Sequence, residues 1–213
     1  MSPPPRLWLL RHAQPLIAPG VCYGQLDVAA DAALTLSAAQ AFATTLRNPL
    51  SASIGQQSPI PLRHSPLQRC EQLMLALTVQ TPDLVWNVHA DPRIQEMHFG
   101  QWEGVAWCDI PAADIDAWAQ QLHLHAPGGG ESLASMLKRV QSALRDSWQH
   151  DSQGGQRDVV WITHAGVIRC VQWLVQHGQQ PPSSSEWNLP APACGGWTSW
   201  EWSRIQQGCA ALT

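Results

Sequence analysis

Two histidines stand where short apolar segments end. Residues 7–10 (LWLL) are followed by Arg11 and His12, and residues 158–163 (DVVWIT) are followed by His164. We expect both segments to be buried strands of a parallel sheet, whose carboxyl ends meet at one edge. The two imidazole rings are therefore expected to lie close together. A neutral imidazole nitrogen is a competent nucleophile, and a covalent intermediate divides one difficult transfer into two easier steps.

Phosphoryl transfer is the chemistry that these residue types favour. The transferred group carries negative charge on three equatorial oxygens, which requires well-placed positive donors. Arg11 directly precedes His12, and Arg69 falls in the first turn of a predicted helix, so both can supply forked N–H donors. A helix starting after Gly166 would add its positive end. A histidine ordinarily titrates near pH 6.5. We therefore expect activity to fall in acid, because protonation removes the lone pair of the nucleophile.

A leaving alkoxide also needs a proton. Glu96 opens a glycine-containing loop at residues 96–104 (EMHFGQWEG), where apolar and aromatic neighbours reduce contact with water. Partial removal from water favours the protonated form of a carboxyl group, as a general acid requires. Glu96 is therefore the candidate acid, and it becomes the general base when water attacks. Glu103 and Glu131 are competing carboxylates close by in sequence.

The chain resembles the histidine phosphatase superfamily, which includes phosphoglycerate mutases, fructose bisphosphatases and the alpha-ribazole phosphatases of cobalamin synthesis. The resemblance rests on five blocks that run in the family's order, at residues 9–13 (LLRHA), 65–69 (SPLQR), 96–104 (EMHFGQWEG), 130–132 (GES) with 139–140 (RV), and 162–166 (ITHAG). Together they span about residues 7 to 175, which is most of the chain.

The resemblance assigns a role to five residues. It implies that His12 is the nucleophile, that Glu96 is the proton donor, and that Arg11, Arg69 and His164 hold the phosphoryl group. It implies a mechanism that needs no metal ion and no organic cofactor. The sequence offers no metal site either, because the spacing of its nine histidines is uninformative for a ligand set.

Three positions depart from the family's usual pattern. The family usually has glycine where Ala13 stands, and alanine costs about 1 kcal/mol or more if that backbone needs a positive φ. Phosphoglycerate mutases have threonine and asparagine at the positions of Pro15 and Ala18, which argues against a mutase. Residues 19–27 (PGVCYGQLD) resemble the alpha-ribazole phosphatase-like branch instead.

Periodicity and turn residues predict the elements that position these side chains. We expect strands at residues 7–10, 60–63, 84–88 and 158–163, and an edge strand at 197–202. We expect helices at residues 37–47, with Ser37 as the cap, after Ser65, which is the N-cap with Pro66 first in the helix, at 131–148 and at 167–177. Loops are expected at residues 54–61 and 181–192. This order predicts an α/β three-layer sandwich, with a mostly parallel central sheet and helices on both faces. We expect a single domain over residues 1–213, with a loop and helical excursion at about residues 97–130.

Composition excludes several classes of partner. The net charge is −4, 13% of residues are charged and Lys138 is the only lysine, which argues against a nucleic-acid surface. No segment approaches the roughly 18 uninterrupted apolar residues of a membrane span. Six scattered cysteines with no Cys-x-x-Cys pair fit a reducing cytoplasm. Among the twelve tryptophans, Trp102, Trp161 and Trp173 sit in patterned segments and are expected to pack in the core.

We therefore expect a cytoplasmic phosphomonoesterase that acts through a phosphohistidine on a small phosphorylated substrate, with alpha-ribazole 5'-phosphate as the specific candidate. Two alternatives stay open at this point. One is a mutase-type phosphotransferase, and the other is a non-catalytic module that binds a phosphorylated ligand. The tryptophan-rich strand at residues 197–202 could also pair with a second copy to form a homodimer.

Overall fold

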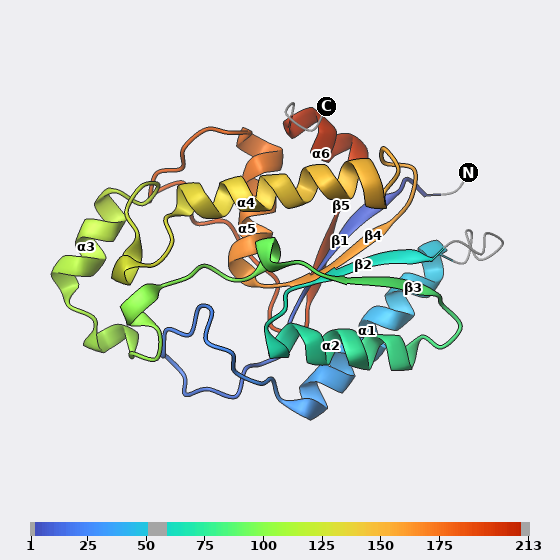
Figure 1. The fold of residues 1–213 in the computed structure, drawn as a ribbon, viewed down its shortest axis with the longest axis horizontal. Coiled ribbons are helices and arrows are strands. Elements are labelled where there is room, and N and C mark those ends of the chain that lie inside the picture. The colour runs from blue at the N-terminus through green and yellow to red at the C-terminus, as the bar shows by residue number, and fades with distance from the viewer. Residues whose placement is uncertain (1–2, 51–58, 210–213) are drawn as a thin grey trace.

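A five-stranded sheet forms the centre of the protein (Figure 1). The computed structural model describes residues 3–50 and 59–209, with side chains for residues 3–47 and 59–209. The strands lie in the order β3-β2-β4-β1-β5, with bounds β1 (Arg6–Arg11), β2 (Ile60–His64), β3 (Trp86–Ala90), β4 (Val159–Thr163) and β5 (Trp197–Glu201). Only β5 runs antiparallel to its neighbour. The sheet is therefore mixed but mostly parallel, as the sequence predicts.

Helices cover both faces of this sheet (Figure 1). On one face lie α1 (Ala32–Leu50) and α2 (Gln68–Gln80). On the other lie α4 (Leu133–Asp146), α5 (Ala165–His177) and α6 (Trp202–Gly208). The predicted three-layer α/β sandwich is confirmed.

The two central strands contribute alternate side chains to the two cores. In β1, Leu7 and Leu9 pack with α4 and α5, whereas Trp8 and Leu10 pack with α1 and α2. Successive side chains of a strand point to opposite faces, and both faces are buried here, so the strand must be apolar throughout. This explains the uninterrupted apolar run that precedes Arg11.

The register of β1 and β4 brings the two histidines together. Arg11 pairs with Thr163 across the parallel ladder, and the His12 backbone N–H donates to the Thr163 carbonyl at 3.0 Å. His12 and His164 each follow the last paired residue of their strand. Both side chains therefore leave the sheet at the same edge, as expected.

Both predicted helix caps are wrong. Helix α1 begins at Ala32, five residues before Ser37, because the carboxylate of Asp31 accepts from the Leu34 N–H at 2.9 Å and caps it earlier. Helix α2 begins at Gln68, so Ser65 is not its N-cap.

Other boundaries also differ from the prediction. The third strand begins at Trp86 instead of residue 84, because the Leu84 N–H is bonded to the Thr81 carbonyl in the turn that ends α2. Helix α6 was not predicted. Residues 54–58 of the predicted loop at 54–61 lie outside the described residues, and residues 60 and 61 belong to β2.

Residues 97–130 contain helix α3 (Ala112–Gln120) and short 3-10 helices, and no strand is found there.

Trp102, Trp161 and Trp173 are buried, as predicted. No helix in the described ranges has the length and apolar character needed to cross a bilayer. Strand β5 is an edge strand, as expected. Its pairing with a second copy and the single-domain organisation stay predictions.

Candidate active site

The rings of His12 and His164 lie next to each other, with centroids 5.0 Å apart and planes inclined by 57°. Only 1% of the surface of His12 is exposed, and His164 is completely buried. Two buried imidazoles at the carboxyl edge of a sheet are costly to protonate, because burial penalises their charged forms. The structure thus brings the two rings together, as the sequence predicts.

His12 is held as a neutral imidazole with one defined free nitrogen. Its Nδ1 lies 2.7 Å from the Ala13 carbonyl oxygen, which can only accept, so Nδ1 carries the proton and Nε2 has the free lone pair. Burial lowers the pKa of His12 to about 3, and the charges of Arg69 and Arg11 act in the same direction. Our expectation that this group titrates near pH 6.5 is therefore wrong, because it ignored burial. His12 is uncharged over the whole physiological range.

Ala13 is accommodated without backbone strain. Among the described non-glycine residues, only Gln153 has a positive φ. The condition under which alanine would be costly at position 13 is therefore not met. Ala13 is buried and uses its carbonyl to orient His12.

The guanidinium groups of Arg11 and Arg69 are anchored by backbone carbonyls. Arg69 is completely buried, and its two Nη atoms donate to Leu26 at 2.7 Å and Gly24 at 2.6 Å. Its Cζ also lies 5.2 Å from the centre of the Tyr23 ring. Arg11 donates from Nη1 to the Pro192 carbonyl at 2.8 Å. Both positive charges are therefore fixed in place before any ligand binds.

Several buried nitrogens near His12 have no hydrogen-bond partner. In the part of the chain that the structure describes, these include Arg11 Nε, Arg69 Nε and His164 Nδ1. Buried donors are almost always paired in folded proteins, so each of these atoms calls for an explanation. The three belong to the three residues that the family resemblance assigns to phosphoryl binding. A tetrahedral anion has enough acceptor oxygens to pair with all of them.

Ser65, which directly follows strand β2, orients the ring of His164. Ser65 Oγ lies 2.8 Å from His164 Nε2, and the Leu67 N–H donates to the same Oγ at 3.3 Å. The Leu67 N–H occupies one lone pair of the hydroxyl, and in the Nδ1–H tautomer of His164 the hydroxyl donates its own proton to Nε2. We assign this tautomer because it gives the hydroxyl proton an acceptor and leaves Nδ1–H to donate to a ligand. Burial lowers the pKa of His164 well below its usual value, so the ring is a neutral donor.

Glu96 lines the cavity and is held by its own backbone and by α5. Its Oε1 accepts from the Met97 N–H at 3.0 Å, and its Oε2 accepts from the Gly166 N–H at 3.1 Å. Its backbone carbonyl accepts from Gln25 at 2.9 Å and from Arg139 at 3.1 Å. The carboxyl group is therefore fixed at the start of the helix that follows His164.

The two competing carboxylates are committed to structural contacts. Glu103 Oε1 accepts from the backbone N–H groups of Gln25 and Phe99, each at 2.9 Å. Glu131 pairs with Arg139 at 2.7 Å. Neither residue lines the cavity, which leaves Glu96 as the carboxyl group available to a ligand there.

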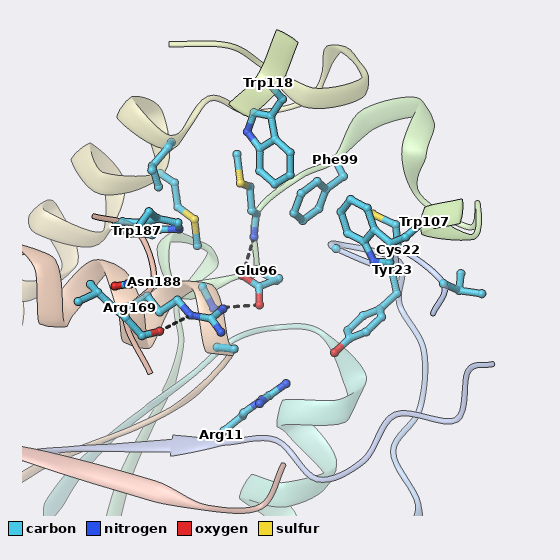
Figure 2. A pocket seen from close by; sticks show the side chains of 18 residues that line it. Arg11, Cys22, Tyr23, Glu96, Phe99, Trp107, Trp118, Arg169, Trp187 and Asn188 are labelled. Carbon is cyan, nitrogen blue, oxygen red and sulfur yellow. Dashed lines mark hydrogen bonds between the residues drawn. The ribbon is translucent and has the colours of Figure 1, made fainter. Parts of the chain in front are cut away.

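A cavity of about 440 Å³ opens beside these groups (Figure 2). Arg11, Tyr23 and Glu96 line it, and the aromatic rings of Phe99, Trp107 and Trp118 form one wall. Figure 2 shows Arg169, Trp187 and Asn188 on the opposite side of Glu96 from Tyr23 and Trp107. His12, Arg69 and His164 are not in its lining, but their chain neighbours Arg11, Ala165 and Gly166 are.

The aromatic wall is built within the excursion. Phe99 lies edge to face against Trp107 at 5.5 Å and Trp118 at 5.9 Å, and these two tryptophans are nearly parallel. Unlike the three tryptophans predicted to be buried, Trp107 is 38% exposed and faces the cavity.

Sequence reasoning missed Tyr23 and Arg169 as well as the aromatic wall. Tyr23 is the only tyrosine in the chain and lies within the block at residues 19–27. Arg169 interrupts an otherwise apolar stretch of α5 four residues after Ala165. The sequence marks both residues as unusual, but no local pattern shows which loop or which helix face borders a cavity.

The thiol that borders this cavity is a weaker nucleophile than the neutral imidazole of His12. Cys22 lines it, but burial raises the pKa of its thiol to about 12, so the nucleophilic thiolate is scarce. Within residues 3–47 and 59–209, no group of three or more His, Cys, Asp or Glu side chains could hold a metal ion.

The fold and the site together define an α/β protein with two guanidinium groups and two buried imidazoles gathered at the carboxyl edge of its sheet. The sequence profile of the histidine phosphatase superfamily (branch 1) matches residues 7–208. The chain belongs to this superfamily.

Several of its relatives are named as phosphatases. The chain is 28% identical to the glucosyl-3-phosphoglycerate phosphatase of Mycobacterium tuberculosis, over 94% of this chain and 84% of that protein. It is 25% identical to the adenosylcobalamin/alpha-ribazole phosphatase of Salmonella typhimurium, over 70% and 67% of the two chains. A solved mycobacterial glucosyl-3-phosphoglycerate phosphatase in complex with VO3 superposes with a TM-score of 0.70 at 25% identity, covering 94% of both chains. The protein is therefore a phosphatase of this superfamily.

Proposed function

We propose that the protein is a phosphomonoesterase that forms a phosphohistidine on His12 without a metal ion. The observation that carries this proposal is the set of unpartnered buried nitrogens on Arg11, Arg69 and His164 around a neutral His12 ring. These donors match the equatorial oxygens of a transferred phosphoryl group. The aromatic cavity beside them takes the alcohol part of the ester.

In the proposed first step, His12 Nε2 attacks phosphorus and the bond from phosphorus to the ester oxygen breaks. Glu96, in its acid form, gives its proton to the leaving oxygen, so the alcohol departs neutral. In the second step, the Glu96 carboxylate takes a proton from water as that water attacks the phosphohistidine. Inorganic phosphate is released, and His12 and the Glu96 proton are restored.

Two candidate substrates are supported by the relatives and by one sequence block. Alpha-ribazole 5'-phosphate is one candidate, supported by the block at residues 19–27 and by the Salmonella relative. A glucosyl-3-phosphoglycerate is the other, supported by the mycobacterial relatives. Both carry a ring that the wall of Phe99, Trp107 and Trp118 can contact.

Hydrolysis of p-nitrophenyl phosphate in excess chelator tests the mechanism. We expect full activity for the native protein and a loss of at least about 10³-fold for His12→Ala. His89→Ala is the matched control, because His89 is exposed on edge strand β3 and should leave turnover unchanged. Equal turnover by native protein and His12→Ala would reject the mechanism, and loss of native activity in chelator would reject metal independence.

A substrate panel then separates the remaining possibilities. The panel should contain alpha-ribazole 5'-phosphate, glucosyl-3-phosphoglycerate, nucleoside monophosphates and glycerate phosphates, with inorganic phosphate as the product measured. Transfer of phosphate to a second hydroxyl of a glycerate would instead identify a mutase, which Pro15 and Ala18 argue against. Tight phosphate binding without turnover would identify the non-catalytic alternative.

A further inference from the structure

One cation in the cavity has no role in the proposed phosphoryl chemistry. Arg169 lies on α5 one turn beyond Ala165, and both residues line the cavity with Gly166 between them. Four residues of α-helix correspond to about 6 Å along the axis. Arg169 is therefore displaced along the helix from the strand end that presents His164. It faces the part of the cavity that would hold the alcohol.

The guanidinium group of Arg169 is anchored at one end and open at the other. Its Nε donates to the Leu189 carbonyl at 2.9 Å, which fixes the plane of the group. Its two Nη atoms make no hydrogen bond within the described part of the chain, and the group has no ion-pair partner there. Asn188, next to the anchoring residue, also lines the cavity (Figure 2). A fork of free N–H donors in a half-buried cavity is a site for a planar anion.

We propose that Arg169, assisted by Asn188, binds a carboxylate on the alcohol part of the substrate, so that the preferred substrates are phosphorylated carboxylic acids. This rests on the proposed phosphomonoesterase function and adds the substrate class to it. Arg169 is then a specificity-determining residue and takes no part in breaking the ester bond.

The charges in the cavity favour a carboxylate over a second phosphate. Arg169 contributes one positive charge on this side, and Glu96 contributes a carboxyl group to the same cavity. A monoanion is balanced by the single guanidinium group, whereas a phosphate dianion would leave excess negative charge beside Glu96. A neutral alcohol would leave the Arg169 donors desolvated and unpaired, which is unfavourable.

A matched pair of small esters isolates this contact. The compounds 3-phosphoglycerate and glycerol 3-phosphate differ only in a carboxylate against a hydroxymethyl group. For the native protein we expect kcat/KM to be at least about tenfold higher for 3-phosphoglycerate. Arg169→Gln should lower kcat/KM for 3-phosphoglycerate by about 10- to 100-fold and change that for glycerol 3-phosphate by less than about threefold. Arg169→Lys, which keeps the charge but not the fork, should lie between the two.

The controls separate this inference from the proposed function. Arg204→Gln removes an exposed arginine of α6 outside the cavity and should leave both substrates unchanged. Glycerol 3-phosphate turnover reports whether Arg169→Gln is folded and chemically competent. No preference in the native protein, or an equal loss on both substrates in Arg169→Gln, would overturn the carboxylate assignment. If p-nitrophenyl phosphate hydrolysis is also independent of His12, the proposed function itself fails.

Discussion

His12 and His164 lie ring beside ring at the carboxyl edge of the sheet, one after β1 and the other after β4, with centroids 5.0 Å apart. Burial is the main cause that lowers the pKa of both rings, and the charge of Arg69 lowers each of them further. The pair is therefore uncharged, and the positive charge of the site resides on guanidinium groups. In the mechanism that we propose, this division leaves His12 free to act as a nucleophile while the arginines stabilise the anion.

The buried histidines should make stability depend on pH. The pKa of His12 is near 6.5 in the unfolded chain and about 3 in the folded protein, so only the unfolded chain takes up this proton between those values. His12 therefore favours folding above pH 6.5, and this contribution is lost as pH falls towards 3, at about 1.4 kcal/mol per pH unit.

Denaturant unfolding at pH 7.5, 6.0 and 5.0 measures this dependence. The free energy of unfolding of His12→Gln, which cannot titrate, should fall less steeply with acid than that of the native protein. Parallel curves for the two proteins would show that His12 does not carry the effect. For the same reason, the activity of the folded enzyme should not fall through a His12 titration near pH 6.5.

The sequence predicted the meeting of the two histidines, but it did not predict their surroundings in the folded protein. The register of β1 and β4 follows from two apolar strands with both faces buried, so the meeting of His12 and His164 was predictable. The pKa of His12 was not, because it depends on tertiary burial. Ser65 was read as a local helix cap, but its hydroxyl serves His164, which is distant in sequence. Arg169 was missed because no local pattern shows which helix face borders a cavity.

Glu96 and Glu103 should be separable by mutation. Glu96→Gln cannot donate a proton, so hydrolysis of an alkyl phosphomonoester should fall by about 10²-fold or more. Hydrolysis of p-nitrophenyl phosphate should fall much less, because nitrophenolate is a good leaving group.

Glu103→Gln is the matched control, since it removes a charge that accepts two backbone N–H groups outside the cavity. It should reduce the free energy of unfolding by about 1–3 kcal/mol and leave the ratio of the two rates unchanged. If Glu103→Gln changed that ratio and Glu96→Gln did not, the acid would be Glu103.

Gly166→Ala should disable Glu96 without unfolding the protein. A Cβ at position 166 would overlap Oε1 of Glu96, which is the mobile end of a side chain and can move aside. Stability should change little, whereas alkyl phosphomonoester turnover should fall by about 10²-fold because the carboxyl group is displaced. Thermal unfolding and steady-state kinetics measure the two effects. Full activity in Gly166→Ala would show that the position of Glu96 is not critical.

Ser65→Ala should remove the hydrogen bond that orients the ring of His164. Removal of Oγ leaves Nε2 without the hydroxyl that lies 2.8 Å away, so the proton is no longer held on Nδ1. We expect kcat/KM to fall by about 5- to 30-fold. The ring nitrogen chemical shifts of His164 should move from the Nδ1–H tautomer towards a mixture, which a purely structural defect would not produce. An unchanged tautomer would rule out this positioning role.

Trapping of the covalent intermediate tests the central claim most directly. The protein is mixed with a 32P-labelled phosphomonoester, quenched in alkali within milliseconds and digested, and the labelled peptide is sequenced by mass spectrometry. We predict one acid-labile, alkali-stable phosphohistidine at His12, formed in chelator and absent from His12→Gln. A label on any other residue, or burst-free turnover with no labelled histidine, would contradict the account.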